Sequence, residues 1–310
     1  MKKTNSSNNI DFKNVLILTS KSNSHYLNSE NHGRITLEDI YKPQIVFRFL
    51  RHMPFFAKFS IGLWKKKVNE SDIVIVFDSL LTKQSLYHIV KICRGKRLIL
   101  FFRNKVTSKK RRWGFLKLTS LGVEIWSYNS LDCNKYGFKY HPDPPDDKLI
   151  ESFKTKQPAL FDMVFLGDNK GREKQLNNIV NICKTYNLIS YLYVINGAKI
   201  PGNRCIGNKY MQYVKYLDLL CDSKAVLDIV NENNWGLTYR PFEAMFLRKK
   251  LITNYIDIIN YDFYDPSNIF VIGKDDLEQI ANFLNSSYKE IDSHIMDKYR
   301  TKYWLKNFNI

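Results

Sequence analysis

Two short segments in the second half of the chain contain residue types that bind phosphate. The first is residues 165–172 (FLGDNKGR), where an apolar run ends at Gly167 and a helical pattern follows Lys170 and Arg172. Backbone N–H groups at a helix start, the helix dipole and two cations together favour an anion. The segment is neither a Walker P-loop nor a GxGxxG motif, and such a junction also occurs without a ligand, so both interpretations stay open.

The second segment is residues 231–244 (NENNWGLTYRPFEA), a polar loop between a predicted strand and a predicted helix. Proline is tolerated in the first turn of a helix, so Pro241 marks the helix start. Glu243 lies in that turn, where its carboxylate can accept both hydroxyls of a ribose while the preceding Gly-Leu-Thr backbone approaches phosphates. The alternative is that Glu243 only favours the helix dipole or pairs with a neighbouring arginine.

The second half of the chain resembles the nucleotide-sugar-binding domain of GT-B glycosyltransferases, particularly those of bacterial lipopolysaccharide, O-antigen and capsule synthesis. Three segments carry the resemblance: residues 165–172, 223–254 (SKAVLDIVNENNWGLTYRPFEAMFLRKKLITN) and 268–284 (NIFVIGKDDLEQIANFL). The closing segment KYRTKYWLKNF resembles the family's tail, which crosses back onto the first domain. The match covers residues 161–305, whereas the first half resembles the family mainly in its pattern of strands and helices.

The resemblance implies a donor site in the second half. Glu243 would hold the donor ribose, and Arg240 would be a further contact to phosphate or sugar. The other residues implied by the match would line or neutralise the diphosphate: Gly167, Lys170, Arg172, Gly236, Leu237 and Thr238. Many retaining members carry two glutamates in E-x7-E spacing, but the residue eight before Glu243 is Trp235, so retaining or inverting chemistry stays open.

No cofactor and no metal are expected. Cationic side chains and a helix terminus can stabilise a leaving diphosphate without a metal ion. The acidic motifs at 143–147 and 262–265 lack the Asp-x-Asp spacing of metal-dependent transferases. The five cysteines are widely spaced and form no CxxC pair, which argues against a zinc ribbon and a thioredoxin-like site.

The general base of an inverting reaction is expected in the first half of the chain. Asp78 is the leading candidate because it follows an apolar run (IVIVF), and open parallel sheets bind ligands at the carboxyl ends of their strands. His25 and His32 are the alternatives, since a neutral imidazole has a suitable pKa. Arg103, after the run RLILFF, is a predicted cation at the same edge. Asp78 could instead cap the following helix, and the histidines could simply be exposed.

Alternating strands and helices must position these side chains. Short apolar runs predict buried strands at 14–19, 73–77, 97–102, 123–128, 162–166, 190–195, 225–230, 250–253 and 269–272. Helical patterns lie between them, which indicates right-handed βαβ units and parallel sheets. The predicted fold is α/β and GT-B, with two doubly wound Rossmann-like domains facing each other across a cleft.

Length and proline content predict the domain boundaries. A chain of 310 residues has room for two domains of roughly 150 residues. The proline-rich segment HPDPPDDK ends the first series of strands and helices. The predicted parts are an acceptor-binding domain at 1–145, a linker at 146–160, a nucleotide-sugar-binding domain at 161–285 and a C-terminal helix at 286–310 that packs back on the first domain.

Positive charge is concentrated in the first half. The formal net charge is +18, and residues 1–155 contain 28 basic and 13 acidic side chains. Basic residues beside bulky aromatic ones, as in residues 41–68, suit a membrane-surface helix. One alternative is an amphipathic core helix with a solvated basic face. The other is nucleic-acid binding, but the sequence contains no known nucleic-acid-binding signature. The residues predicted to face an acceptor or an anionic membrane are Trp64, Lys65, Lys66, Lys67, Arg103, Arg111, Arg112 and Trp113.

Charge and resemblance together predict a glycosyltransferase that uses a nucleotide-diphosphate donor, with UDP-sugar as the first guess, and a lipid-linked or surface-glycan acceptor. The protein would be cytoplasmic and peripheral on the inner face of the cell membrane, because no apolar run approaches the ~18 residues of a spanning helix. The alternative is a non-catalytic protein that binds membranes or nucleic acid through its basic first half.

Overall fold

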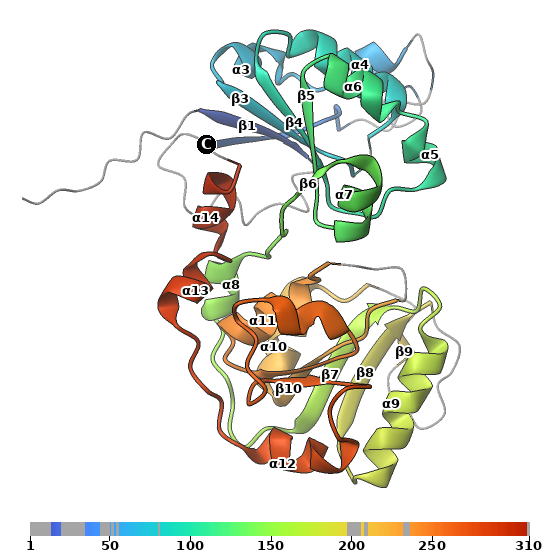
Figure 1. Ribbon diagram of the computed structural model, residues 1–310. Helices are drawn as coiled ribbons and strands as arrows, with labels where there is room; N and C mark the ends of the chain where they lie inside the picture. The colour runs from blue at the N-terminus through green and yellow to red at the C-terminus, as the bar shows by residue number, and fades with distance from the viewer. Residues whose placement is uncertain are drawn as a thin grey trace, which may run out of the picture. The chain divides into compact units, whose positions relative to one another are not determined.

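The computed structural model describes residues 14–19, 35–43, 50, 53, 56–79, 81–196, 206–207, 210–231 and 236–308. The chain divides into two compact units (Figure 1). Unit 1 comprises Met1–Ser127, Asp132–His141 and Leu305–Ile310, and unit 2 comprises Tyr128–Leu131 and Pro142–Trp304.

Unit 1 is built on a six-stranded parallel sheet with the order β2-β1-β3-β4-β5-β6. Its strands are β1 Val15–Thr19, β2 Ile35–Asp39, β3 Ile73–Phe77, β4 Arg97–Phe102, β5 Val123–Ser127 and β6 Lys139–Tyr140. The central strands consist of branched aliphatic and aromatic residues, which favour a pleated sheet that is buried on both faces.

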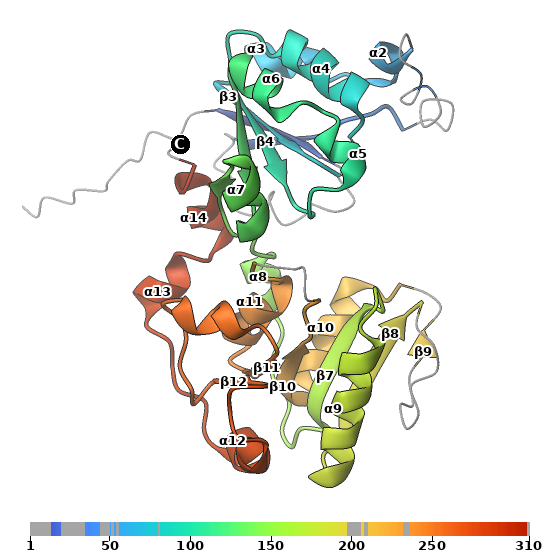
Figure 2. The same ribbon diagram turned by 45° about the vertical axis from the view of Figure 1, so that its right-hand side comes forward.

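Helices cover one face of this sheet (Figures 1 and 2). They include α3 Lys65–Asn69, α4 Lys83–Ile92 and α6 Phe115–Ser120, whose apolar residues pack on alternate side chains of β1, β3, β4 and β5. The short helices α2 Ala57–Ser60, α5 Ser108–Arg111 and α7 Ser130–Tyr136 lie between the strands in sequence. On the opposite face, the ring of Phe308 packs on Phe101 and Trp126, with centroids 5.9 and 4.9 Å apart.

Unit 2 contains a second six-stranded parallel sheet with the order β12-β11-β10-β7-β8-β9. Its strands are β7 Phe161–Asp168, β8 Ser190–Ile195, β9 Ile206–Gly207, β10 Ser223–Asp228, β11 Lys250–Thr253 and β12 Ile269–Val271. Val164 packs toward α10 Tyr213–Cys221 and α11 Tyr239–Phe246, while Met163 and Phe165 pack toward α9 Glu173–Thr185 and α12 Ile280–Asn285. Each face of the sheet therefore has its own helical layer.

The last part of unit 2 is held on α8 Asp147–Glu151. The Arg300 guanidinium donates to Asp147 at 3.0 Å and to both oxygens of Glu151 at 2.8 and 2.7 Å. The Trp304 indole donates to the Pro142 carbonyl at 3.0 Å. These bonds fix the segment between α13 Ser293–Asp297 and α14 Thr301–Lys306, together with Trp304 of α14, against α8 and Pro142.

The prediction of two doubly wound α/β units is confirmed, and all nine predicted strands are present with ends shifted by no more than two residues. The prediction missed β2, whose sequence ITLED has a charged end, and the two-residue strands β6 and β9. The helix predicted over 108–120 is divided into α5 and α6, because Gly114 adopts a left-handed φ of 76°. The predicted closing helix is likewise divided into α13 and α14.

Candidate functional site

The carboxyl ends of β7, β10 and β11 gather polar side chains at one edge of the unit 2 sheet. Asp228 ends β10 and is buried, with 1% of its surface exposed. It accepts hydrogen bonds from the hydroxyls of Thr238 at 3.1 Å and Thr253 at 3.4 Å. Thr238 also caps α11, since its hydroxyl accepts from the Arg240 N–H at 3.2 Å. Burial raises the pKa of Asp228, while the Arg240 charge opposes that shift.

The turn after β7 brings together the two segments, 165–172 and 231–244, whose residue types suit phosphate binding. Lys170 and Gly171 both have left-handed backbones, with φ of 41° and 83°, and the Arg172 N–H closes the turn on the Asn169 carbonyl at 2.7 Å. The Arg172 guanidinium donates to the Asp168 carbonyl at 2.6 Å, and the Asn231 amide donates to the Lys170 carbonyl at 3.0 Å. The Lys170 side chain itself is exposed.

Arg240 spans this edge from α11 to β7. Its guanidinium donates to the Leu166 carbonyl, lies 3.7 Å from Asp228 and sits over the Phe165 ring at 5.2 Å. A Cβ at Gly167 would lie 3.2 Å from its Nη2 atom, so the glycine makes room for the guanidinium.

Two donors at this edge lack acceptors. Within the part of the chain that the structure describes, the Nε atoms of Arg172 and Arg240 are buried without a hydrogen-bond partner. Burial and the nearby Arg240 charge lower the pKa of Arg172. The two guanidinium groups are therefore close enough for their charges to repel each other. Buried N–H donors need an acceptor, which an anion or a water molecule would supply at this edge.

Glu243 points inward rather than over the loop. Its two carboxylate oxygens accept hydrogen bonds from the hydroxyls of Tyr213 at 2.9 Å and Tyr216 at 3.0 Å, both on α10. Burial raises the pKa of Glu243; Arg240 and the two hydroxyls oppose the shift. The structure thus gives two tyrosine hydroxyls, rather than an arginine or the helix dipole alone, as the partners of Glu243, and the ribose contact stays a prediction.

Gly236 and Leu237, in the loop before α11, are both closely packed against the protein. A side chain at Gly236 would collide with the backbone carbonyl of Tyr128, which explains the glycine by close approach. The Leu237 side chain is 2% exposed and belongs to the unit 2 core, so only its backbone can contact a ligand. Sequence reasoning missed Asp228, Tyr213 and Tyr216; the acid at the end of an apolar run (AVLD) was the available signal for the first.

Asp78 lies at the carboxyl end of β3, as the sequence predicted. Its side chain is buried, accepts from the Arg103 backbone N–H at 2.7 Å and forms an ion pair with Lys110. Burial raises the pKa of Asp78 against the opposing effect of Lys110. Thr82, not Asp78, caps α4 through its hydroxyl. His25 and His32 lie outside the described residues.

The aromatic and basic residues of unit 1 separate into two groups. Trp64 and Trp113 are only 1% and 4% exposed, so their side chains belong to the core and cannot reach a membrane in this structure. An amphipathic pattern does not distinguish a core-facing tryptophan from a membrane-facing one. Lys65, Lys66, Arg111 and Arg112 are exposed, whereas Lys67 is half-buried and pairs with Glu38.

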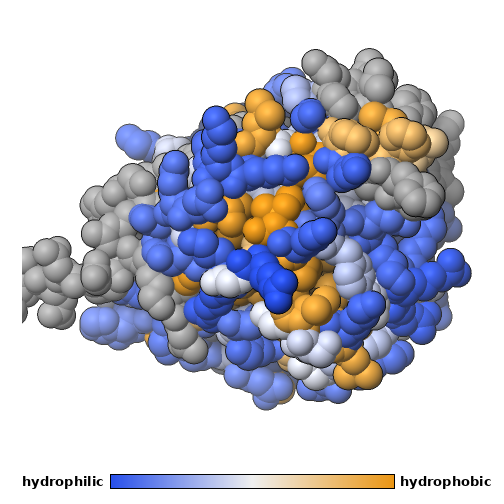
Figure 3. Space-filling view, turned by 90° about the horizontal axis from the view of Figure 1, so that it is seen from above, coloured by the Kyte–Doolittle hydropathy of each residue, from blue (hydrophilic) through white to orange (hydrophobic). Residues whose placement is uncertain are grey.

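The exposed apolar residues of this region are different ones. Leu63 and Leu116 are 86% and 88% exposed, and Phe56 and Phe59 are about half exposed. α2 contacts α4, and Lys117 of α6 lies 5.6 Å from the ring of Tyr87 on α4, so these helices are neighbours. Figure 3 shows apolar side chains framed by hydrophilic ones on this unit.

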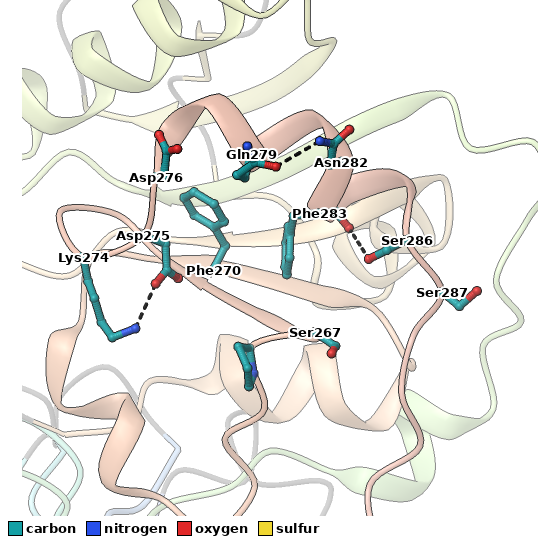
Figure 4. Close-up of a pocket in the computed structure, with 11 residues that line it drawn as sticks. Ser267, Phe270, Lys274, Asp275, Asp276, Gln279, Asn282, Phe283, Ser286 and Ser287 are labelled. Carbon is teal, nitrogen blue, oxygen red and sulfur yellow. Dashed lines mark hydrogen bonds and ion pairs between the residues drawn. The ribbon is translucent and has the colours of Figure 1, made fainter.

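A pocket of about 630 Å³ lies elsewhere in unit 2, beside β12 and α12 (Figure 4). Its polar side chains bond to their neighbours: Lys274 to Asp275 at 2.9 Å and Asn282 to Gln279 at 3.0 Å. None of the residues predicted to bind the donor, to act as the base or to face a membrane lines it, although seven of its lining residues belong to segment 268–284. We therefore place the candidate site at the edge formed by β7, β10 and α11.

Two further properties of the described residues concern metal ions and membranes. No group of three or more His, Cys, Asp or Glu side chains in these residues is arranged to hold a metal ion. No helix within them has the length and apolar character that crossing a bilayer requires.

Comparison with known proteins identifies the fold. No family model and no curated protein matches the chain. Among solved structures it is similar to the sucrose-phosphate synthase from Thermosynechococcus elongatus, with a TM-score of 0.55 and 11% identity over 96% of this chain and 87% of that one. It is also similar to an α1,3-fucosyltransferase, with a TM-score of 0.48 and 12% identity over 95% of this chain and 88% of that one. The first similarity shows that the chain has the GT-B fold.

Proposed function

We propose that the protein is a glycosyltransferase that transfers a sugar from a nucleotide-diphosphate donor to a lipid-linked or surface-glycan acceptor. The observation that carries the proposal is the pair of buried Nε donors of Arg172 and Arg240, which have no partner among the described residues. Leaving buried donors unpaired costs free energy, and the oxygens of a diphosphate would supply acceptors. The GT-B fold supports the same assignment.

The donor residues would act on the leaving group. Arg172 and Lys170, together with the backbone at 236–238, would contact the diphosphate, and Glu243 would accept hydroxyls of the ribose. Fixed cations stabilise the charge that develops as the bond between sugar and diphosphate breaks. We therefore propose that transfer needs no metal ion.

Asp78 remains our candidate for the base of an inverting reaction. It would take the proton of the acceptor hydroxyl while that oxygen attacks the sugar and the diphosphate leaves. Burial raises the pKa of this carboxyl, and a raised pKa makes a carboxylate a stronger base. Its ion pair with Lys110 must loosen for this role. His25 and His32 stay as alternatives.

The exposed residues of unit 1 support a membrane-associated acceptor. We define the apolar–basic patch as Phe56, Lys58, Phe59, Leu63, Lys65, Lys66, Arg111, Arg112, Leu116 and Lys117. Cationic side chains would contact anionic headgroups and the leucines would enter the boundary of the acyl chains. A peripheral position on the membrane would place the enzyme beside a lipid-linked acceptor.

A binding panel tests the donor class first. We would measure thermal stabilisation of the wild-type protein, Arg172→Gln and Lys184→Gln by UDP, GDP, CDP and ADP. A nucleotide at 100 times its dissociation constant adds about 2.7 kcal/mol of stability. Lys184 is exposed in the last turn of α9, whereas Arg172 is the residue that precedes this helix, so the Lys184 variant removes an equal charge away from the site.

The corresponding radiolabelled sugar nucleotide then tests transfer into a bacterial lipid extract. We expect stabilisation by one nucleotide and label in the lipid phase, both retained in Lys184→Gln and lost in Arg172→Gln. Absence of stabilisation by every nucleotide contradicts the proposed function. Lipid or nucleic-acid binding without any transfer would favour the non-catalytic alternative.

A further inference from the structure

Two tyrosine hydroxyls occupy the carboxylate that the proposed function assigns to the ribose. Tyr213 and Tyr216 are three residues apart on α10, which places both on one face of the helix. Tyr213 donates to Oε1 of Glu243 and Tyr216 donates to Oε2. The two rings lie 6.1 Å apart, so the carboxylate is held between them as a fork.

The fork leaves acceptor capacity on the carboxylate. An ionised carboxylate has about four lone-pair sites, and the two tyrosines use one on each oxygen. Each oxygen therefore keeps a lone pair that could accept one more hydrogen bond, and two vicinal ribose hydroxyls would match the two oxygens once the edge opens around Glu243, which is 2% exposed here. The existing bonds fix the plane of the carboxylate before any ligand arrives, which lowers the entropic cost of binding.

The two tyrosines differ in burial. Tyr216 is 3% exposed and packs in the unit 2 core, whereas Tyr213 is half-buried at the start of α10. Tyr216 can only be a fixed anchor. Tyr213 lies at the margin of the unit 2 core, where its hydroxyl can share the Glu243 carboxylate with a ligand.

We propose that Tyr213 and Tyr216 are positioning residues that hold the Glu243 carboxylate for the ribose hydroxyls of the donor, with Tyr216 as the anchor. This inference rests on the proposed function, because it needs a nucleotide at the unit 2 edge. It adds the prediction that discrimination between ribose and deoxyribose depends on two hydroxyls that do not themselves need to contact the nucleotide.

The test uses variants that remove only a hydroxyl: Tyr216→Phe, Tyr213→Phe and, as the matched control, Tyr299→Phe. Tyr299 also donates to a carboxylate in unit 2, but to that of Asp262, at 2.6 Å, and not to that of Glu243. Calorimetric titration would compare UDP, GDP, CDP and ADP with their 2′-deoxy counterparts. We expect the wild-type protein and Tyr299→Phe to bind one ribonucleotide about tenfold more tightly than its deoxy form.

In Tyr216→Phe the affinity ratio should fall toward one, and in Tyr213→Phe it should fall by a smaller factor. A ratio that stays unchanged in both variants overturns the positioning role while leaving the donor site intact. A ratio of one in the wild-type protein overturns the ribose contact itself, and no nucleotide binding at all overturns the proposed function. Tyr213→Phe lies outside the deep core, so it keeps the test valid if Tyr216→Phe does not fold.

A pH profile distinguishes positioning from general destabilisation. Tyr213 and Tyr216 on α10, Arg240 on α11 and Asp228 on β10 are the ionisable groups that face the Glu243 carboxylate. Loss of a hydroxyl that stabilises the ionised form should raise the pKa of Glu243 further. The acidic limb of the affinity profile for the ribonucleotide should then move to higher pH in Tyr216→Phe and stay in place in Tyr299→Phe. An unmoved limb contradicts the inference.

Discussion

The two sheets place a buried aspartate at the same topological point but surround it differently. Asp78 follows β3 in unit 1 and Asp228 ends β10 in unit 2, and each is 1% exposed. Asp78 is neutralised by one lysine and one backbone N–H. Asp228 accepts from two threonine hydroxyls and lies near a guanidinium.

The two sheet edges differ in their unpaired hydrogen-bond donors. In unit 2 the described structure contains buried guanidinium Nε atoms that lack partners, beside a turn with two left-handed residues. At the unit 1 edge, the Asp78 carboxylate already has a donor on each oxygen. An acid at the end of a strand therefore indicates the edge where chemistry can occur, while unpaired donors indicate which edge would bind an anion.

The largest expected effect is on the ion pair in unit 1. Lys110→Met leaves the Asp78 carboxylate buried with a single N–H donor, and the loss of one partner from a buried pair costs about 3–5 kcal/mol. Urea unfolding would measure the free energy of unfolding. Adding Asp78→Asn should recover most of the loss. A cost below about 1 kcal/mol would show that Lys110 does not neutralise Asp78.

The next effect is on catalysis in unit 2. Arg172→Gln should lower kcat by about 10²–10³-fold, the usual result of removing one donor to a developing anion. Arg103→Gln in unit 1 should lower it by less than tenfold, because that side chain lies over the Phe77 ring at 4.9 Å and is not among the residues proposed to contact the diphosphate. Steady-state kinetics would check both values. Equal losses of kcat in the two variants would contradict the proposed difference between the two edges.

Two glycines sharpen the comparison at a smaller scale. Gly167→Ala puts a Cβ 2.9 Å from the Phe165 ring and 3.2 Å from Arg240, so the ring must shift and the guanidinium must give by a few tenths of an ångström. We expect a cost of about 1–3 kcal/mol and about tenfold weaker nucleotide binding. Gly122→Ala in unit 1 meets no atom within 4 Å but has a φ of 83°, so it should cost about 1–2 kcal/mol without changing nucleotide affinity. Thermal unfolding and calorimetric titration would measure both properties.

The smallest effect concerns a surface ion pair of unit 1. Hydrogen bonds from Arg97 lower the pKa of Glu124 to about 2, from an ordinary value of 4.5. A depressed carboxyl pKa stabilises the fold above pH 4.5, and this stabilisation is lost as the pH falls from 4.5 to 2. Glu124→Gln should cost about 1 kcal/mol or less at pH 7, since solvent screens the pair. Unfolding curves of both proteins should converge near pH 2, and a constant difference would contradict the assignment.

The sequence predicted what depends on local pattern and missed what depends on distant partners. The apolar run IVIVF predicted β3 with the same first and last residues as the structure shows, because buried parallel strands need continuous apolar residues. Trp64 and Trp113 had the same pattern whether they faced a core or a membrane. The contacts of Glu243 with α10 span 27 and 30 residues, and nothing near Glu243 in sequence marks them.

Hydrogen exchange measured by mass spectrometry tests the central claim, that the anion-binding edge belongs to unit 2, most directly. Exchange would be compared with and without saturating UDP, GDP, CDP or ADP. We expect one nucleotide to slow exchange in peptides that cover residues 165–173 and 236–243, with no change at 78–82 and 103–111. Protection confined to the unit 1 peptides, or no protection with a nucleotide that stabilises the protein, would contradict the account.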